Sequence, residues 1–191
     1  VQPVPQSLLL PDAEIQFYPA LFSATDCDRL WTELKTQIQW QQDRIQMFGR
    51  NLPLPRLTAW YGDPGTIYSY SGIQMTPLPW IDCLLEIKSR LAAVSPDCFN
   101  SVLLNFYRDG QDSMGWHSDD EPELGTNPVI ASVSFGGSRK FKLRHKHQDC
   151  KTQLELTDGS LLLMRGKTQH FWHHQVPKAA KAMPRINLTF R

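Results

Sequence analysis

Apolar side chains recur at helical spacing in two segments of the N-terminal half of the chain. The run Ser23-Ala24-Thr25-Asp26 has the form of a capping box and predicts a helix that continues to about Trp40. A second helix is predicted from about Pro79 to about Ala93, because proline suits the first turn of a helix. The apolar positions expected on one face of this second helix are Ile81, Leu84, Leu85 and Leu91.

The remaining N-terminal segments follow neither the helical nor the strand period. Residues 1–22 are rich in proline and aromatic residues, and we expect an extended arm packed on the domain. Residues 43–75 are crowded with proline, glycine and aromatic residues, which predicts hairpins and turns rather than a helix.

From residue 100 onward, short runs of branched and aromatic residues are bounded by Gly, Asp, Asn or Pro. These runs predict strands at residues 101–108, 129–135, 139–145, 152–156, 160–164, 170–176 and 185–191. Two helices followed by many short strands, without alternation of the two, are typical of a mainly β (α+β) chain. The expected fold is a sandwich or jelly roll with supporting N-terminal helices.

The composition fits a single globular domain. A chain of 191 residues is long enough to bury a sizeable core, and we expect one domain over residues 1–191. Within it, residues 1 to about 100 are expected to form an N-terminal extension, and residues 101–191 the jelly-roll core. With 41% hydrophobic and 20% charged residues, the chain belongs to neither the disordered nor the fibrous class.

The sequence also bears on the compartment. No stretch approaches the roughly 18 consecutive apolar residues of a membrane span, and no secretory signal is recognised. The cysteines are scattered without a CxxC pair, so a structural zinc site is not expected. We interpret them as reduced thiols of an intracellular protein, cytoplasmic in a bacterium or nuclear in a eukaryote, with disulfides outside the cell as the alternative. They are Cys27, Cys83, Cys98 and Cys150.

Opposite charges are concentrated in different parts of the chain. Residues 1–138 carry 8 Lys and Arg against 16 Asp and Glu, whereas residues 139–191 carry 12 against 3. The basic part favours attraction of phosphates or of a dicarboxylate. The alternative is a solvated surface on which the two signs meet once the chain folds.

The pair His117-x-Asp119 is the first candidate for chemistry. In an extended backbone, residues two apart project to the same side, so this imidazole and this carboxylate can face one ion. A second histidine from a distant strand would complete the facial triad of non-haem Fe(II) oxygenases, which leaves positions open for a chelating co-substrate and O₂. An HxD pair occurs by chance in many chains, and alone it does not establish a metal site.

The third ligand has several candidates. His170, His173 and His174 cluster in one strand-like segment, and spacing alone does not choose among them. His145 and His147 also share a strand face, but they flank a basic turn, where we expect a solvent-exposed hairpin tip.

The last predicted strand alternates strictly between polar and apolar residues. Its polar face consists of Arg185, Asn187, Thr189 and Arg191. A guanidinium group matches a carboxylate bidentately, as a dicarboxylate co-substrate requires. Asn105 and Tyr107 share a face of the strand at 101–108 and offer further hydrogen bonds. The alternative is an edge strand with its polar face in solvent.

Together these motifs resemble the signature of the AlkB family of Fe(II)- and 2-oxoglutarate-dependent dioxygenases. The resemblance covers roughly residues 43–191 and is closest to the second and third human AlkB homologues, including residues 131–136 and 158–162. Four ordered motifs in one chain are far more specific than any single one. They are Asn105-x-Tyr107, Asp109-Gly110, His117-x-Asp119 and Arg185-x-Asn187-x-Thr189-x-Arg191.

The resemblance implies a double-stranded β-helix with a nucleotide-recognition lid, and an oxidoreductase that uses Fe(II), 2-oxoglutarate and O₂. The family places its distal histidine three residues before a proline, which here selects His174, before Pro177. The implied iron ligands and catalytic residues are His117, Asp119 and His174. The implied 2-oxoglutarate site consists of Asn105, Tyr107, Arg185, Asn187, Thr189 and Arg191. We favour Arg185 for the distal carboxylate, although spacing does not decide between the two arginines.

The implied reaction is oxidative demethylation of bases such as 1-methyladenine and 3-methylcytosine in the repair of alkylated DNA, with release of formaldehyde. A flipped base would stack on the aromatic lid, and acidic residues would face its positive charge. The implied substrate residues are Tyr68, Tyr70, Asp120, Glu121, Phe48 and Arg50. Ordinary hairpin packing is the alternative for the two tyrosines, and a turn with an exposed aromatic for the Phe48 segment.

Other functions compete with this hypothesis. The same chemistry is compatible with RNA or a protein as substrate, and a non-catalytic jelly roll that binds nucleic acid is the alternative outside enzymes. A zinc hydrolase would use Glu121 as general base but would leave the arginine-rich strand without a role. We expect a monomer that acts on single- or double-stranded DNA and has no membrane partner.

Overall fold

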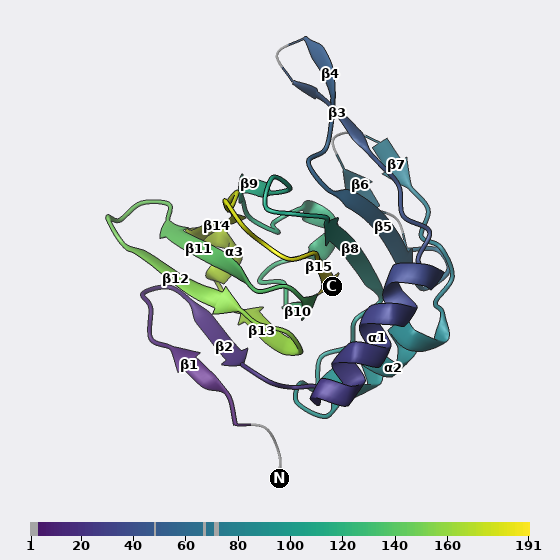
Figure 1. Ribbon diagram of the computed structural model, residues 1–191. Coiled ribbons are helices and arrows are strands. Elements are labelled where there is room, and N and C mark those ends of the chain that lie inside the picture. The colour runs from purple at the N-terminus through teal and green to yellow at the C-terminus, as the bar shows by residue number, and fades with distance from the viewer. Residues whose placement is uncertain (1–3, 48, 67, 71–72) are drawn as a thin grey trace.

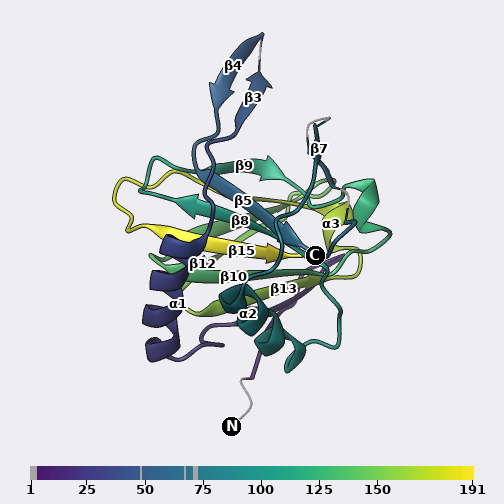
Figure 2. The same cartoon turned by 90° about the vertical axis from the view of Figure 1, so that its right-hand side faces the viewer.

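The computed structural model describes residues 4–47, 49–66, 68–70 and 73–191. Its main strands form two sheets that face each other, and two helices pack on the outer face of the larger sheet (Figures 1 and 2). The larger sheet has the strand order β1-β2-β13-β10-β15-β8-β5, and the smaller sheet has the order β12-β11-β14-β9. The antiparallel pairing and the two facing layers agree with the predicted jelly roll.

The elements have the following bounds. The larger sheet contains β1 (Gln6–Leu8), β2 (Glu14–Tyr18), β5 (Leu57–Gly62), β8 (Ser101–Tyr107), β10 (Ile130–Gly136), β13 (Ser160–Arg165) and β15 (Arg185–Phe190). The smaller sheet contains β9 (Met114–His117), β11 (Arg139–His145), β12 (Lys151–Leu156) and β14 (Trp172–Val176). Two separate hairpins pair β3 (Arg44–Met47) with β4 (Arg50–Pro53), and β6 (Tyr68–Tyr70) with β7 (Ile73–Met75). The helical segments are α1 (Ala24–Gln37), α2 (Asp82–Ala92), α3 (Thr168–Phe171) and a 3₁₀ turn at Pro122–Leu124.

Both predicted long helices are present but shorter than expected. Ser23 caps α1, because its Oγ accepts a hydrogen bond from the backbone N–H of Asp26 at 3.1 Å. Helix α2 begins at Asp82, and Ile81 is its N-cap residue. Leu85 is 46% exposed, so its predicted place on the apolar face was wrong. The buried face of α2 consists of Cys83, Leu84, Ile87 and Leu91.

Strand alternation divides the core into two layers. On β13, Leu161 and Leu163 face the helices, whereas Leu162 and Met164 face the smaller sheet. The apolar residues of β15 also pack toward the helices, so its polar residues lie between the two sheets. Because β15 lies between β10 and β8 and is buried along its length, the alternative of a solvated edge strand was wrong.

The larger sheet includes strands from both sides of residue 100. Strand β2 pairs with β13, so the predicted N-terminal arm contributes to the sheet. Strand β5 lies in the segment that was expected to form hairpins and turns rather than a helix, and it pairs with β8 in the larger sheet. Strand β14 begins at Trp172 rather than at residue 170, because α3 occupies the preceding residues.

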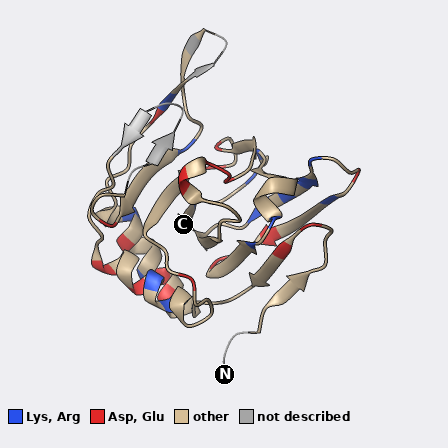
Figure 3. Cartoon of the chain, turned by 180° about the vertical axis from the view of Figure 1, so that it is seen from behind, with Lys and Arg blue, Asp and Glu red and all other residues tan. Residues whose placement is uncertain are grey.

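The two charge classes meet only in part. Figure 3 shows Lys and Arg along the strands of the smaller sheet and both signs on the helices that pack on the larger sheet. Lys146 pairs with Asp120 at 3.2 Å, and Arg165 pairs with Asp97 at 2.9 Å. The alternation Arg139–His145 leaves Lys140 exposed on the outer face of the smaller sheet.

Two sequence-based expectations concern the compartment. The four cysteines are free thiols, so the disulfide alternative was wrong. None of the helices in the described residues has the length and apolar character of a transmembrane helix.

Candidate active site

A cluster of two histidines and one aspartate lies between the sheets. One potential ligand atom from each of His117, Asp119 and His174 lies within 4.8 Å of the others. The two histidines are cross-strand partners on β9 and β14, and their ring centroids are 4.2 Å apart. This donor set, with one carboxylate and two imidazoles on one side, fits an Fe(II) facial triad.

The protonation of these groups suits metal binding. Nδ1 of His117 lies 2.9 Å from the carbonyl oxygen of Gly115, which can only accept, so Nε2 keeps its lone pair. Burial, together with the neighbouring His174, lowers the pKa of His117 to about 4. Burial on its own would raise the pKa of Asp119, but Arg191 and His174 hold it far below its usual range. At neutral pH the site therefore offers a neutral imidazole and a carboxylate.

The segment that follows β9 is fixed from α3 and β14. The Oγ of Ser118 donates to the carbonyl oxygen of Trp172 at 2.9 Å. The backbone N–H of Asp119 donates to Oε1 of Gln169 at 2.9 Å, and this glutamine is buried. These contacts hold Ser118 and the backbone of Asp119, so they orient the Asp119 carboxylate without occupying its oxygen atoms.

The other histidines lie away from the cluster. His170 is on α3 and contacts Oδ1 of Asn127 at 3.0 Å. His173 is half-buried on β14, whose alternation turns it to the face opposite His174. His145 is buried, since its ring packs against the ring of Trp172 on β14. Its Nδ1 accepts the backbone N–H of His147. The predicted exposed hairpin tip therefore holds for His147 but was wrong for His145.

The polar residues of β8 and β15 lie beside one another. Arg185 is the register partner of Tyr107, and Asn187 is the partner of Asn105. The cavity between the sheets is lined by the triad together with Asn105, Tyr107, Asn187, Thr189 and Arg191. Both N–H groups of Asn187 already donate within the sheet, to Ser132 and Val133, and its Oδ1 accepts from the hydroxyl of Thr189 at 3.2 Å, so only a second lone pair of Oδ1 remains for other contacts. The structure thus brings together most of the predicted 2-oxoglutarate residues.

Arg185 is buried and forms no ion pair with a carboxylate of the described residues. Its Nη2 donates to Oγ of Ser134 at 2.9 Å, but Nε and Nη1 have no hydrogen-bond partner among the described residues. Its guanidinium carbon lies 5.3 Å from the centre of the Tyr107 ring. Burial lowers the pKa of Arg185 to about 10. A buried guanidinium with free N–H groups is costly unless an anion pairs with it, which fits the carboxylate of 2-oxoglutarate.

A second cavity shares His117, Asp119 and Arg191 with the first. It has a volume of about 140 Å³, comparable to the roughly 150 Å³ that accommodate one benzene ring. His117 and Asp119 line it, as do Leu78, Leu103 and Met114. The cavity therefore has room for one aromatic ring next to the metal ligands.

The predicted substrate residues are distributed unevenly around this cavity. Glu121 lines it and lies 3.8 Å from Arg191. Asp120 is turned toward Lys146 and lines neither cavity. Strand β6 carries the two tyrosines, Tyr68 and Tyr70, and β4 carries Arg50; their side chains, like all of Phe48, lie outside the described residues.

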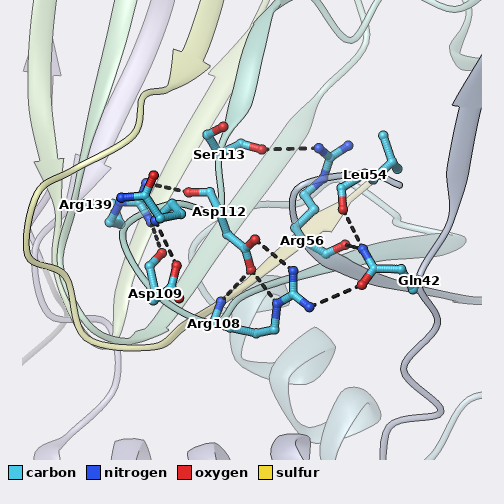
Figure 4. Close-up of polar contacts among 9 residues, drawn as sticks. Gln42, Leu54, Arg56, Arg108, Asp109, Asp112, Ser113 and Arg139 are labelled. Carbon is cyan, nitrogen blue, oxygen red and sulfur yellow. Dashed lines mark hydrogen bonds and ion pairs between the residues drawn. The ribbon is translucent and has the colours of Figure 1, made fainter. Parts of the chain in front are cut away.

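A polar network ties the wall of the second cavity to the loop before β9 (Figure 4). Nε2 of Gln42 donates to the carbonyl oxygens of Leu54 and Arg56, while its Oε1 accepts from Nη1 of Arg108 at 3.1 Å. Arg108 also forms an ion pair with Asp112 at 2.7 Å. The loop that leads to His117 is therefore linked to the segment that carries the hairpin β3–β4.

Several site residues were not recognised in the sequence. Arg56 is buried in the cavity wall, and its Nε donates to Oδ1 of Asn105 at 2.7 Å. Gln169 and Asp43 were also missed, because only tertiary contacts bring them to the site. One available signal was overlooked: His174 lies midway between the apolar Trp172 and Val176, so alternation places it on the buried face of its strand.

Comparisons with known proteins agree with this geometry. Residues 14–191 match the family model of the 2OG-Fe(II) oxygenase superfamily. The chain is 41% identical to "DNA oxidative demethylase ALKBH2" of Bos taurus, and the aligned residues cover 91% of this chain and 67% of that protein. It is 42% identical to "Alpha-ketoglutarate-dependent dioxygenase alkB homolog 3" of Mus musculus, over 94% of this chain and 66% of that protein. Human ALKBH2 is 40% identical to the chain, over 91% of this chain and 71% of that protein.

The chain spans about two thirds of the length of these relatives. A solved structure, "The structure of OsALKBH1", superposes with a TM-score of 0.65 over 98% of this chain and 99% of that chain. At 16% identity, that likeness concerns the fold alone. The family match and the identities of about 40% confirm the predicted membership: the chain belongs to the 2OG-Fe(II) oxygenase superfamily and, within it, to the AlkB family.

Proposed function

We propose that this protein is an oxidative demethylase of N-alkylated nucleic-acid bases, such as 1-methyladenine and 3-methylcytosine, and acts in DNA repair. The observation that carries the proposal is the ring-sized cavity that ends on His117 and Asp119. A base in this cavity would place an N-methyl group next to the triad. The relatives named as DNA oxidative demethylases support the same substrate class.

Fe(II), 2-oxoglutarate and O₂, when bound, would supply the oxidation of a C–H bond, and 2-oxoglutarate would be converted to succinate and CO₂. His117, Asp119 and His174 hold the metal from the smaller sheet. Arg185, beside Tyr107, is our candidate for the distal carboxylate of the co-substrate. The apolar wall around Leu103 and Met114 excludes water from the reacting methyl group.

The chemistry of the product explains why a methylated ring nitrogen is a suitable substrate. Hydroxylation of the methyl group gives an N-hydroxymethyl base, whose C–N bond breaks with the electron pair returning to nitrogen. Formaldehyde and a proton leave, and the cationic base becomes neutral. A base cation is also weakly paired, which lowers the cost of extruding it from a duplex.

The test is demethylation of oligonucleotides with one 3-methylcytosine or 1-methyladenine, single- and double-stranded, as DNA and as RNA. The reactions contain Fe(II), ascorbate and 2-oxoglutarate, and mass spectrometry follows the methyl group. We expect loss of the methyl group that requires 2-oxoglutarate and is absent in His117→Ala. Succinate without demethylation would reject the substrate class but keep the oxygenase. Neither product, with iron bound, would reject the enzyme and favour a nucleic-acid-binding module.

We further propose that the protein acts as a monomer inside the cell and that DNA is preferred over RNA. The DNA and RNA arms of the same assay rank the two substrates. Light scattering of the eluting protein, with and without the oligonucleotide, measures the oligomeric state.

A further inference from the structure

We propose that Asp43 is the residue that selects cationic bases, by accepting a hydrogen bond from their exocyclic amino group. The inference rests on the proposed function and names the determinant of its substrate preference. It starts from the second cavity, whose lining includes Asp43 together with the metal ligands His117 and Asp119. None of the sequence motifs pointed to this aspartate.

The three carboxylates of this cavity are in different situations. Asp119 forms an ion pair with Arg191 and belongs to the metal cluster. Glu121 lies 3.8 Å from the same arginine, so its charge is also shared. Asp43 forms no ion pair within 4 Å with a described residue; its Oδ2 accepts a hydrogen bond from the hydroxyl of Thr58. Of the three, Asp43 therefore has its negative charge left for a ligand.

The backbone around Asp43 is fixed from both sides. Gln41 forms two backbone hydrogen bonds with Thr58, each 2.8 Å long. The carbonyl oxygen of Asp43 accepts the N–H of Leu54 at 2.8 Å. The side chain of Gln42 is held by the network of Figure 4. Since backbone and carboxylate are both held before a ligand arrives, little order has to be gained on binding.

The chemistry of the substrate matches this arrangement. In 1-methyladenine and 3-methylcytosine the amino group is adjacent to the methylated nitrogen, and it shares the positive charge of the ring. A carboxylate forms a charge-assisted hydrogen bond with such a group. In 3-methylthymine, which has the same ring size, a carbonyl oxygen takes the place of the amino group and the ring is neutral. Asp43 would repel that oxygen, so one residue distinguishes the two bases.

The experiment compares the two bases in otherwise identical single-stranded oligonucleotides. Wild type, Asp43→Asn and Asp43→Glu are assayed for kcat/KM on 3-methylcytosine and on 3-methylthymine. The Kd of both oligonucleotides is also measured without O₂, with Fe(II) and 2-oxoglutarate present. The two bases can then be compared even if one of them reacts too slowly for kcat/KM to be measured. Asparagine keeps the size of the side chain and an acceptor for Thr58 but removes the charge.

We expect Asp43→Asn to lower the preference for 3-methylcytosine over 3-methylthymine by about 10-fold or more, because a hydrogen bond between charged groups is lost on the first base and not on the second. Asp43→Glu should restore part of the preference. Thr58→Val, which keeps the charge but removes its hydroxyl partner, should give a smaller loss in the same direction. The control Asp149→Asn changes a carboxylate that is 93% exposed on a hairpin, and it should leave the preference unchanged.

Two results would overturn the inference. Equal losses on both bases in Asp43→Asn would mean that the residue supports the cavity wall without selecting a base. An unchanged preference would mean that its charge does not reach the ligand. In either case demethylation by the wild type keeps the proposed function intact. If the wild type forms succinate but demethylates neither base, the proposed function itself fails.

Discussion

The two faces of the larger sheet are made by the same strands but have different roles. Toward the helices, β15 presents apolar residues such as Leu188, which are fully buried and contribute by packing. Toward the smaller sheet, the same strand presents Arg185 and Asn187, which are nearly as buried but are polar. Alternate residues of one strand thus carry stability and chemistry. Single substitutions should therefore change one property and leave the other in place.

The largest effect is expected from the inner face, at the metal cluster. We expect His174→Ala to weaken Fe(II) binding by more than about 100-fold, since loss of an outer-shell partner alone costs about 10–100-fold. Succinate formation should fall below detection. An anaerobic Fe(II) titration measures the first effect. His173→Ala, on the opposite face of the same strand, is the matched control and should bind iron normally. Equal losses in both variants would contradict the assignment of His174.

The next effect concerns the helix face. We expect Leu188→Ala to lower the free energy of unfolding by about 2–5 kcal/mol, because it leaves a cavity in a fully buried layer. The affinity of the folded protein for 2-oxoglutarate should stay within about twofold. Urea denaturation and titration of the co-substrate give the two values. Leu85→Ala, at an exposed position of α2, should change stability by no more than about 0.5 kcal/mol.

Two buried arginines offer a sharper contrast within the inner face. We expect Arg185→Met to weaken 2-oxoglutarate binding by about 10–100-fold, while the ligand-free protein keeps or gains stability, since an unpaired buried charge is lost. Arg139 stacks on the same Tyr107 ring but donates to three carbonyl oxygens, so Arg139→Met should destabilise the fold. A Tm that falls equally in both variants would show that Arg185 is structural.

The smallest effect tests whether the helix face is closed to solvent. Burial, with Asp158 nearby, raises the pKa of Cys27 to about 12, and burial raises the pKa of Cys83 to about 11. At pH 8 we expect iodoacetamide to label the exposed Cys98 but not these two thiols in the native protein. Mass spectrometry of peptides identifies the labelled sites. Rapid labelling of Cys27 would mean that the layer opens easily, and Leu188→Ala should increase that labelling.

The sequence predicted the fold best where strands are bounded and amphipathic. Strand β9 (Met114–His117) was not predicted, but the other strands from Ser101 onward were located to within a few residues because Gly, Asp, Asn or Pro mark their ends. Strand β5, Leu57–Gly62, was missed because it is buried on both faces and follows two prolines, so it shows no alternation. Helix α3 was read as strand, since four residues do not establish a helical period.

The candidate site was predictable where its geometry is local. The spacing of His117 and Asp119 and the alternation along β15 are properties of a strand, and they can be seen in the sequence. Asp43 and Arg56 could not be found this way, because they reach the cavity through contacts between segments far apart in the chain. Glu121 lines the cavity and Asp120 does not, because Asp120 pairs with Lys146. No local pattern in the sequence connects Lys146 to these two residues.

The central position of β15 also has a consequence for how the chain folds during synthesis. Strands β8 and β10 have no direct pairing with each other; each pairs with β15, which is translated after both. Until β15 leaves the ribosome, the two strands present unpaired edges that can associate with other chains. Because β15 is translated after both strands that it joins, we expect the larger sheet to be completed late in folding.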